Sequence, residues 1–143
     1  HSGSRRGLHR GGAFARVIVV DASAALLGLL NDGPARSMLA EEAIACPHLA
    51  DSEVAHALRA QVLRGELAAD GARRALETWG KLGIERIGVR GLLGRIWELR
   101  ENLSAYDATY VAVAEALGAP LVTADGRLAR APGPRCPVTV VPR

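Results

Sequence analysis

The sequence has little of several residue types, and each shortage narrows what the protein can be. It contains two cysteines, Cys46 and Cys136, with no Cys-x-x-Cys motif and no histidine pair at zinc-ligand spacing. We therefore expect no zinc site and two free, buried thiols, as in a reducing cytoplasm. The sequence contains no run of about 18 uninterrupted apolar residues, so we expect no transmembrane helix. No segment resembles a secretory signal peptide.

Lysine is also scarce, since Lys81 is the only lysine among 18 basic residues. The formal net charge is +3. Four arginines precede the first acidic residue of the chain: Arg5, Arg6, Arg10 and Arg16. The rest of the chain is slightly acidic, so the net charge does not by itself indicate nucleic-acid binding. We interpret residues 1–16 as a linker-like extension without fixed structure and residues 17–143 as one folded domain.

Hydrophobic periodicity and turn residues predict strands that alternate with helices. The β-branched run Val17–Val20 predicts a strand buried on both faces. Further strands are predicted at Ile44–Cys46, Ile84–Val89, Leu121–Thr123 and Val138–Val141. Helices are predicted at Ala22–Leu30, Ala35–Glu42, Leu49–Arg64, Gly91–Arg100, Ser104–Leu117, from an Asp70 cap to Trp79, and for a turn or two within Asp125–Arg130. This alternation predicts an α/β protein, a three-layer α/β/α sandwich with a mostly parallel five-stranded sheet.

Residues 103–125 carry the clearest pattern in the chain. Ser104 precedes a helix with apolar residues at helical spacing, and its hydroxyl can cap the first turn. A glycine and a proline end this helix, and a short strand follows. The helix of such a unit runs antiparallel to the next strand. Asp107 at the helix start and Asp125 after the strand are therefore expected at one edge of the sheet.

Two more carboxylates are expected at that edge. Asp21 directly follows the first strand, and Glu53 lies in the first turns of the helix after the second strand. Two carboxylates about 4 Å apart repel by roughly 4 kcal/mol at an effective dielectric near 20, so four of them need a cation or bound protons. Such oxygen ligands suit Mg²⁺ or Mn²⁺. Ser23 and Thr123 can orient the carboxylates through hydrogen bonds.

Each of these residues also has a purely structural interpretation. Aspartate at a strand-to-helix junction is a favoured helix cap, and the helix dipole stabilises a carboxylate in a first turn. The hydroxyls of Ser23 and Thr123 can equally be ordinary capping or strand groups. For any one acid the capping role is the stronger interpretation, and only the convergence of all four favours a reactive site.

Four segments of the chain together resemble PIN-domain ribonucleases of the VapC toxin type. They are VVDASAAL (Val19–Leu26), SEVAHALR (Ser52–Arg59), LSAYDATYVAVAEAL (Leu103–Leu117) and LVTADGRLA (Leu121–Ala129). The resemblance spans residues 17–141 and implies a Mg²⁺- or Mn²⁺-dependent endoribonuclease, the toxin of a bacterial type II toxin–antitoxin pair. The acidic ligands of the family fall on four residues, with none missing: Asp21, Glu53, Asp107 and Asp125.

The resemblance also implies roles and partners. Asp21 and Asp107 would be the main metal ligands, Asp125 would complete the site, and Glu53 would bind a second ion or position the attacking water. From the sequence itself, no basic residue is placed at the strand ends comparably to the four carboxylates. Three arginines near the edge are either contacts for the RNA backbone or solvated surface charges: Arg59, Arg100 and Arg127.

The implied partners are the RNA substrate, a VapB-like antitoxin and a second copy of the chain in a homodimer, with no membrane. The C-terminal segment of such an antitoxin covers the toxin domain and puts a basic side chain into the acidic pocket. We expect Ala22–Leu30 and Leu49–Arg64 to expose an apolar groove for this segment.

Other acidic α/β proteins agree less well with the sequence. A phosphorelay receiver needs an aspartate after the third strand and a lysine after the fifth, but Arg90 follows the third strand and Lys81 precedes it. A haloacid-dehalogenase-type phosphatase needs Asp-x-Asp where this chain has Asp21-Ala22-Ser23, and no Gly-x-x-x-x-Gly-Lys loop is present. The remaining alternative is a PIN-like module that binds RNA or a protein without cutting.

Overall fold

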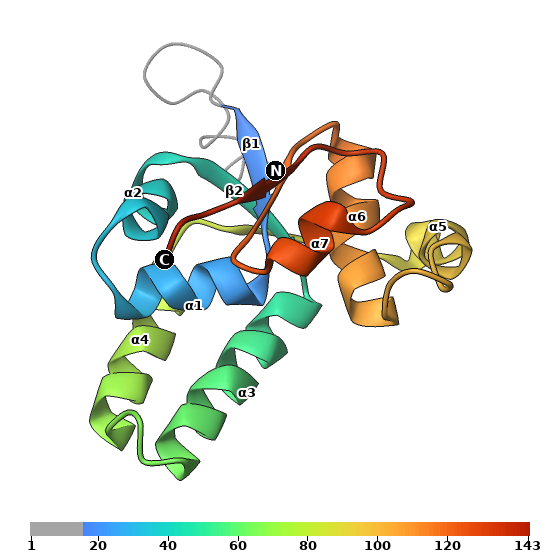
Figure 1. Cartoon of the computed structure of the whole chain (residues 1–143). Helices are drawn as coiled ribbons and strands as arrows, with labels where there is room; N and C mark the ends of the chain where they lie inside the picture. The colour runs from blue at the N-terminus through green and yellow to red at the C-terminus, as the bar shows by residue number, and fades with distance from the viewer. Residues whose placement is uncertain (1–15) are drawn as a thin grey trace.

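A computed structural model of the chain describes residues 16–143 (Figure 1). Five parallel strands form one sheet in the order β3-β2-β1-β4-β5. The strands are β1 (Val17–Val20), β2 (Ala43–Pro47), β3 (Glu85–Ile87), β4 (Leu121–Thr123) and β5 (Val138–Val140). The predicted parallel five-stranded sheet is therefore confirmed. The interpretation of residues 1–16 lies outside the described residues, apart from Arg16.

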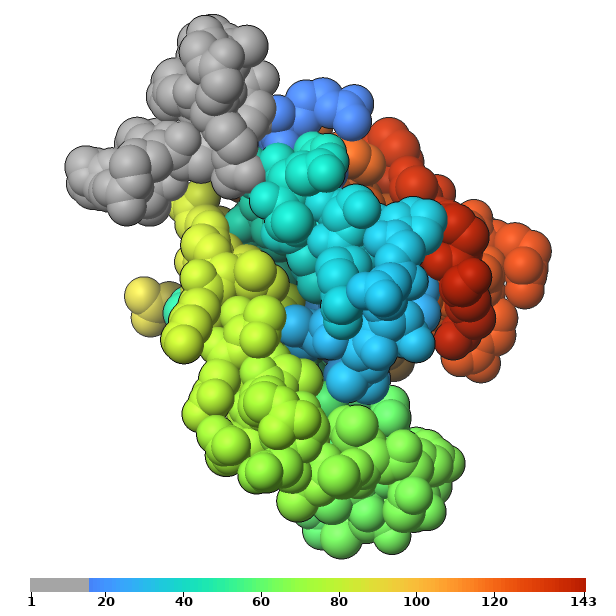
Figure 2. All heavy atoms as spheres, turned by 90° about the vertical axis from the view of Figure 1, so that its left-hand side faces the viewer, coloured from blue at the N-terminus to red at the C-terminus, as the bar shows by residue number. Residues whose placement is uncertain are grey.

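Helices cover both faces of the sheet within residues 16–143. They are α1 (Ala22–Leu30), α2 (Pro34–Glu41), α3 (Leu49–Leu63), α4 (Ala69–Lys81), α5 (Leu93–Glu98), α6 (Ala105–Leu117) and α7 (Gly126–Arg130). Helix α6 packs on β1, β2 and β4, with α5 outside it, whereas α1 packs on β4 and is surrounded by α2, α3 and α4. Helices α3 and α4 project together beyond the sheet (Figure 1), and the same residues, coloured green, extend away from the rest of the molecule in Figure 2. This arrangement is the predicted three-layer sandwich.

Some predicted boundaries are wrong. Asp70 does not cap α4, because the helix begins at Ala69 and places Asp70 in its first turn. The helix predicted at Gly91–Arg100 is divided into a 3-10 turn, Arg90–Leu92, and the short α5. Two glycines within ten residues weaken a continuous helix at this place, since glycine loses the most conformational entropy on ordering.

The core lies around β1 and α6. Val19 and Val20 are fully buried, as the β-branched run predicts. Seven consecutive residues of α6, Ala108–Ala114, are buried, so this helix is covered on more than the single apolar face that its periodicity predicts. The cause is its position between the sheet and α5. The predicted ends are confirmed: the Ser104 hydroxyl accepts from the Asp107 N–H, and Gly118 adopts the left-handed conformation with φ of 62°.

Both cysteines are free. Cys46 is buried and donates to the Val20 carbonyl oxygen, and burial raises the pKa of its thiol to about 12, so it is an inert packing residue. Cys136 is only partly buried, less than predicted. The helices between residues 16 and 143 are all too short or too polar to cross a membrane.

Candidate active site

The strand order reverses at β1, which pairs with β2 on one side and β4 on the other. Ligands of open α/β sheets bind at the carboxyl ends of the strands beside such a reversal. Val20 pairs with Val122, and the Asp21 N–H donates to the Val122 carbonyl oxygen at 3.0 Å. The residues that follow β1 and end β4 are therefore side by side at this position.

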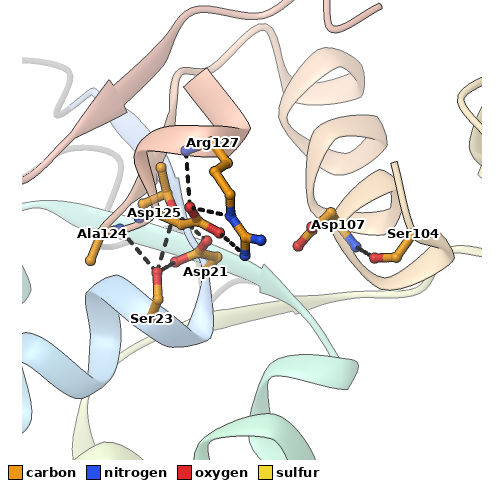
Figure 3. Close-up of polar contacts among 8 residues, drawn as sticks. Asp21, Ser23, Ser104, Asp107, Ala124, Asp125 and Arg127 are labelled. Atoms are coloured by element: carbon orange, nitrogen blue, oxygen red, sulfur yellow. Dashed lines mark hydrogen bonds and ion pairs between the residues drawn. The ribbon is translucent and has the colours of Figure 1, made fainter. Parts of the chain in front are cut away.

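Asp21 is fixed at the reversal by three hydrogen bonds. Its Oδ1 accepts from the Ser23 hydroxyl at 2.7 Å and from the Ala24 N–H at 3.0 Å, and its Oδ2 accepts from the Thr123 hydroxyl at 2.6 Å. The Ser23 hydroxyl in turn accepts from the Ala124 N–H (Figure 3). The predicted orienting hydroxyls are confirmed. Asp21 caps α1 and projects a buried, preorganised carboxylate into the site.

The other three acids reach the same place from different elements. Asp107 lies in the first turn of α6, Asp125 follows β4 and caps α7, and Glu53 lies near the start of α3. All four line one cavity of about 370 Å³. The predicted convergence of four carboxylates is therefore confirmed. As the side chains stand, no group of three or more histidine, cysteine or acidic residues within 16–143 is placed to hold a metal ion.

Burial and the charges of neighbouring carboxylates raise the pKa values of two of the four acids. The pKa of Glu53 is raised by burial and by the charges of Asp107 and Asp21, and a hydrogen bond from Tyr110 opposes part of that rise. Burial also raises the pKa of Asp107, and the charges of Asp21 and Asp125 add to it. Burial and the neighbouring carboxylate charges thus both favour the protonated forms of Glu53 and Asp107.

Asp125 has its own cation, so the expectation of no basic neighbour is wrong. The Arg127 guanidinium contacts both Asp125 oxygens, at 3.3 and 3.1 Å, and its backbone N–H donates at 2.9 Å. These contacts lower the pKa of Asp125. They arise because residues 126–130 form α7, which Asp125 caps (Figure 3). Of the other candidate arginines, Arg59 does not line the cavity, and Arg100 stacks on Trp97 with its guanidinium carbon 4.7 Å from the ring centroid.

Two further residues of the cavity are not predicted as site residues. The Tyr110 hydroxyl donates to Glu53 Oε1 at 2.6 Å, although its spacing identifies it only as an apolar position of α6. His56 also lines the cavity. The sequence does carry a signal for both, since each follows a candidate acid by three positions on a helix and so shares its face: Tyr110 follows Asp107, and His56 follows Glu53.

Fold and site together define an α/β protein with an acidic centre at the reversal of strand order. A family model described as PIN domain matches residues 18–134. The chain is 58% identical over 127 residues to ribonuclease VapC9 of Mycobacterium tuberculosis, a match that covers 89% of this chain and all of that protein. The chain therefore belongs to the PIN-domain family, within its VapC ribonucleases.

Solved structures have the same fold. PAE2754 from Pyrobaculum aerophilum matches with a TM-score of 0.66 at 27% identity, covering 94% of this chain and 90% of that one. VapBC2 from Rickettsia felis, solved bound to a DNA fragment from its promoter, matches with a TM-score of 0.61 at 15% identity, covering 85% and 96%.

Proposed function

We propose that this protein is a Mg²⁺- or Mn²⁺-dependent endoribonuclease, the toxin of a bacterial type II toxin–antitoxin pair. One observation carries the proposal. Four carboxylates from four separate elements line a single cavity, in a chain that is 58% identical to a ribonuclease over the whole length of that relative. All four acids named by the sequence are present in the cavity, which favours cleavage over the alternative of a PIN-like module that only binds.

The donor set of the cavity agrees with a hard divalent cation, because four carboxylates offer only oxygen ligands. Asp21, Asp107 and Asp125 would hold the ion, with Glu53 at a second ion or at the attacking water. Their side chains must draw together to do so, and Asp125 must exchange Arg127 for the ion. A bound ion would supply polarisation of a water molecule and neutralisation of phosphate charge.

The residues of the chain have separate tasks in this reaction. Asp21 is held in one orientation by its three hydrogen bonds, so it loses little entropy on binding. Glu53 uses Oε1 to accept from Tyr110, and within residues 16–143 its Oε2 has no hydrogen-bond partner. With a raised pKa, Glu53 is suited to take a proton at Oε2 from the water that attacks phosphorus.

We further propose that a VapB-like antitoxin occupies the groove between α1 and α3. A cavity of about 260 Å³ in this groove is lined by Ser23, Leu26, Leu27, Leu30, Asn31, Gln61 and Arg143. It shares Ser23 and Leu26 with the carboxylate cavity. A basic side chain of a peptide that lies on these leucines can therefore reach the four carboxylates directly, as the resemblance implies. We also propose that the protein is cytoplasmic and forms a homodimer. Light scattering of the purified chain tests the homodimer.

Cleavage of RNA tests the proposed activity. Asp21→Asn keeps an oxygen that can cap α1 while it removes the buried charge, so we expect an intact fold and a loss of cleavage of about a hundredfold or more. Asp32→Asn is the matched control, because Asp32 is 95% exposed outside the cavity. Wild-type activity in Asp21→Asn would contradict the assignment. Binding of RNA without metal-dependent cleavage by the wild type would establish the binding module instead.

A further inference from the structure

A second depression adjoins the carboxylate cavity, and the proposed chemistry does not use it. Its volume is about 200 Å³. The residues that line it and not the carboxylate cavity come from the loop before α6, from α7 and from the residue after α7: Asn102, Leu103, Ser104, Arg127, Leu128 and Ala131. Asp107 and Asp125 line both hollows. These two carboxylates therefore form the boundary between the carboxylate cavity and the second depression.

The second depression combines apolar surface with hydrogen-bond donors. Leu128 is buried and Leu103 is partly buried, so both present carbon atoms at its wall. The Asn102 side-chain amide has no hydrogen-bond partner among residues 16–143, and the Ser104 hydroxyl accepts from the Asp107 N–H while its own proton stays available. Arg127 adds a positive charge. An apolar wall, neutral donors and one cation are the groups that bind a nucleotide.

Arg127 lines the second depression next to the boundary residue Asp125. Its side chain is 85% exposed, and within residues 16–143 its guanidinium hydrogen-bonds and ion-pairs with Asp125 alone. If Asp125 turns to a metal ion, the guanidinium is released beside the place where the scissile phosphate must lie. A guanidinium presents paired N–H donors that match two phosphate oxygens.

We propose that this second depression binds the nucleotide that flanks the scissile phosphate of a single-stranded RNA. Arg127 holds the phosphate of that nucleotide, and Asn102 and Ser104 contact its base or ribose. Unpaired nucleotides can enter a depression of this kind, whereas duplex RNA is contacted along its outer surface. The inference rests on the proposed function, since it assigns part of the same substrate.

Equilibrium binding of a fluorescent single-stranded RNA of mixed sequence tests the assignment at several salt concentrations. The measurement uses full-length protein with the Asp21→Asn substitution, which slows cleavage about a hundredfold or more. Because Asp21 is itself a proposed metal ligand, Mn²⁺ is raised for each variant until RNA binding no longer changes. Arg127→Gln and Asn102→Ala are compared with Arg130→Gln. The control removes an arginine from the same helix that lines neither hollow. Steady-state cleavage by the same three variants with an intact Asp21 separates KM from kcat.

We expect Arg127→Gln to weaken binding and raise KM about tenfold, in keeping with the loss of a charge-assisted hydrogen bond. The slope of log K against log salt should fall by about 0.7, because one phosphate contact to a single strand is lost. Asn102→Ala should weaken binding without changing that slope. Arg130→Gln should leave KM within about twofold and the slope nearly unchanged.

Equal slopes for Arg127→Gln and Arg130→Gln would overturn the assignment. If Arg127 only neutralises Asp125, Arg127→Gln would change metal affinity and melting temperature but not the salt slope of RNA binding. That outcome would also overturn the assignment of Arg127 to the phosphate. Failure of the proposed function looks different, since the wild type would then cleave no RNA with any divalent ion. The binding slopes would still decide whether the second depression takes a nucleotide.

Discussion

The Tyr110 hydroxyl donates a hydrogen bond of 2.6 Å to Glu53 Oε1 across 57 positions of sequence. It joins α6 to α3 inside the carboxylate cavity, with Tyr110 only 1% exposed. The contact orients Glu53 and offsets part of the rise in its pKa that burial and Asp107 cause. A tyrosine in the core thus sets both the position and the proton affinity of the candidate base.

Tyr110→Phe should therefore raise the pKa of Glu53 further, since it removes the contact that lowers it. The acid limb of the pH–activity profile should move to higher pH, because Glu53 then loses its proton only at a higher pH. Loss of the hydrogen bond should also reduce the free energy of unfolding by about 1 kcal/mol. Tyr106→Phe is the control, because Tyr106 lies on the same helix and is 62% exposed. An unchanged profile in Tyr110→Phe would remove Glu53 from the proton transfer.

The stability of the metal-free protein should depend on pH through Glu53 and Asp107. Both folded-state pKa values are raised, so the folded protein keeps protons that the unfolded chain releases. This contribution is complete below the unfolded value of about 4 and is lost as pH rises through the raised values. Mn²⁺ binds the deprotonated cluster, so it should stabilise more at pH 8 than at pH 5. Melting curves with EDTA and with Mn²⁺ measure this. An equal metal effect at both pH values would indicate that the four carboxylates act only as separate helix caps and as charges near the starts of helices.

Glu115→Gln should destabilise the packing of α5 on α6. The Glu115 carboxylate accepts from Arg95 at 2.7 and 3.1 Å and from the Arg135 N–H at 2.7 Å. Burial alone would raise its pKa, but these bonds together lower it. The stabilisation is present above the unfolded pKa near 4.3 and is lost as pH falls through the lowered folded value. We expect a loss of about 2 kcal/mol at pH 7 that shrinks in acid.

Denaturant unfolding of Glu115→Gln beside Glu98→Gln measures this contribution. Glu98 also pairs with Arg95, at 3.2 Å, but is 63% exposed, so its substitution should change stability by less than about 1 kcal/mol. Equal effects of the two variants would show that the partly buried ion pair contributes no more than the exposed one.

Gly28 allows α1 and α2 to approach closely. A Cβ at Gly28 would lie 2.8 Å from the Ala35 carbonyl oxygen and 2.7 Å from a Leu39 methyl carbon. Gly28→Ala should therefore separate the helices and cost about 1–3 kcal/mol, like other overpacked sites. Gly80→Ala is the matched control on α4, where an added Cβ meets nothing within 4 Å. It should stabilise the protein by up to about 1 kcal/mol. Thermal melts that rank the two variants in the opposite order would contradict this account.

Much of the fold and the identity of the site acids follow from local sequence. The run Val17–Val20 specifies a central strand because β-branched residues suit a sheet covered on both faces. Ser104 and Gly118 specify the ends of α6, since one hydroxyl caps free N–H groups and glycine adopts the left-handed conformation. Once strands and helices alternate, α/β geometry brings Asp107 and Asp125 to one edge without further information.

The tertiary structure decides how the acids are used. The sequence does not reveal that Tyr110 meets Glu53, because that contact depends on how α6 and α3 pack around the cavity. It does not reveal that Arg127 turns back onto Asp125, which requires the short helix α7. Local propensity acts over a few residues, and together with the alternation of strands and helices it places the backbone. Which side chains share a cavity, and therefore which carboxyl pKa values rise or fall, depends on contacts between segments that are distant in the chain.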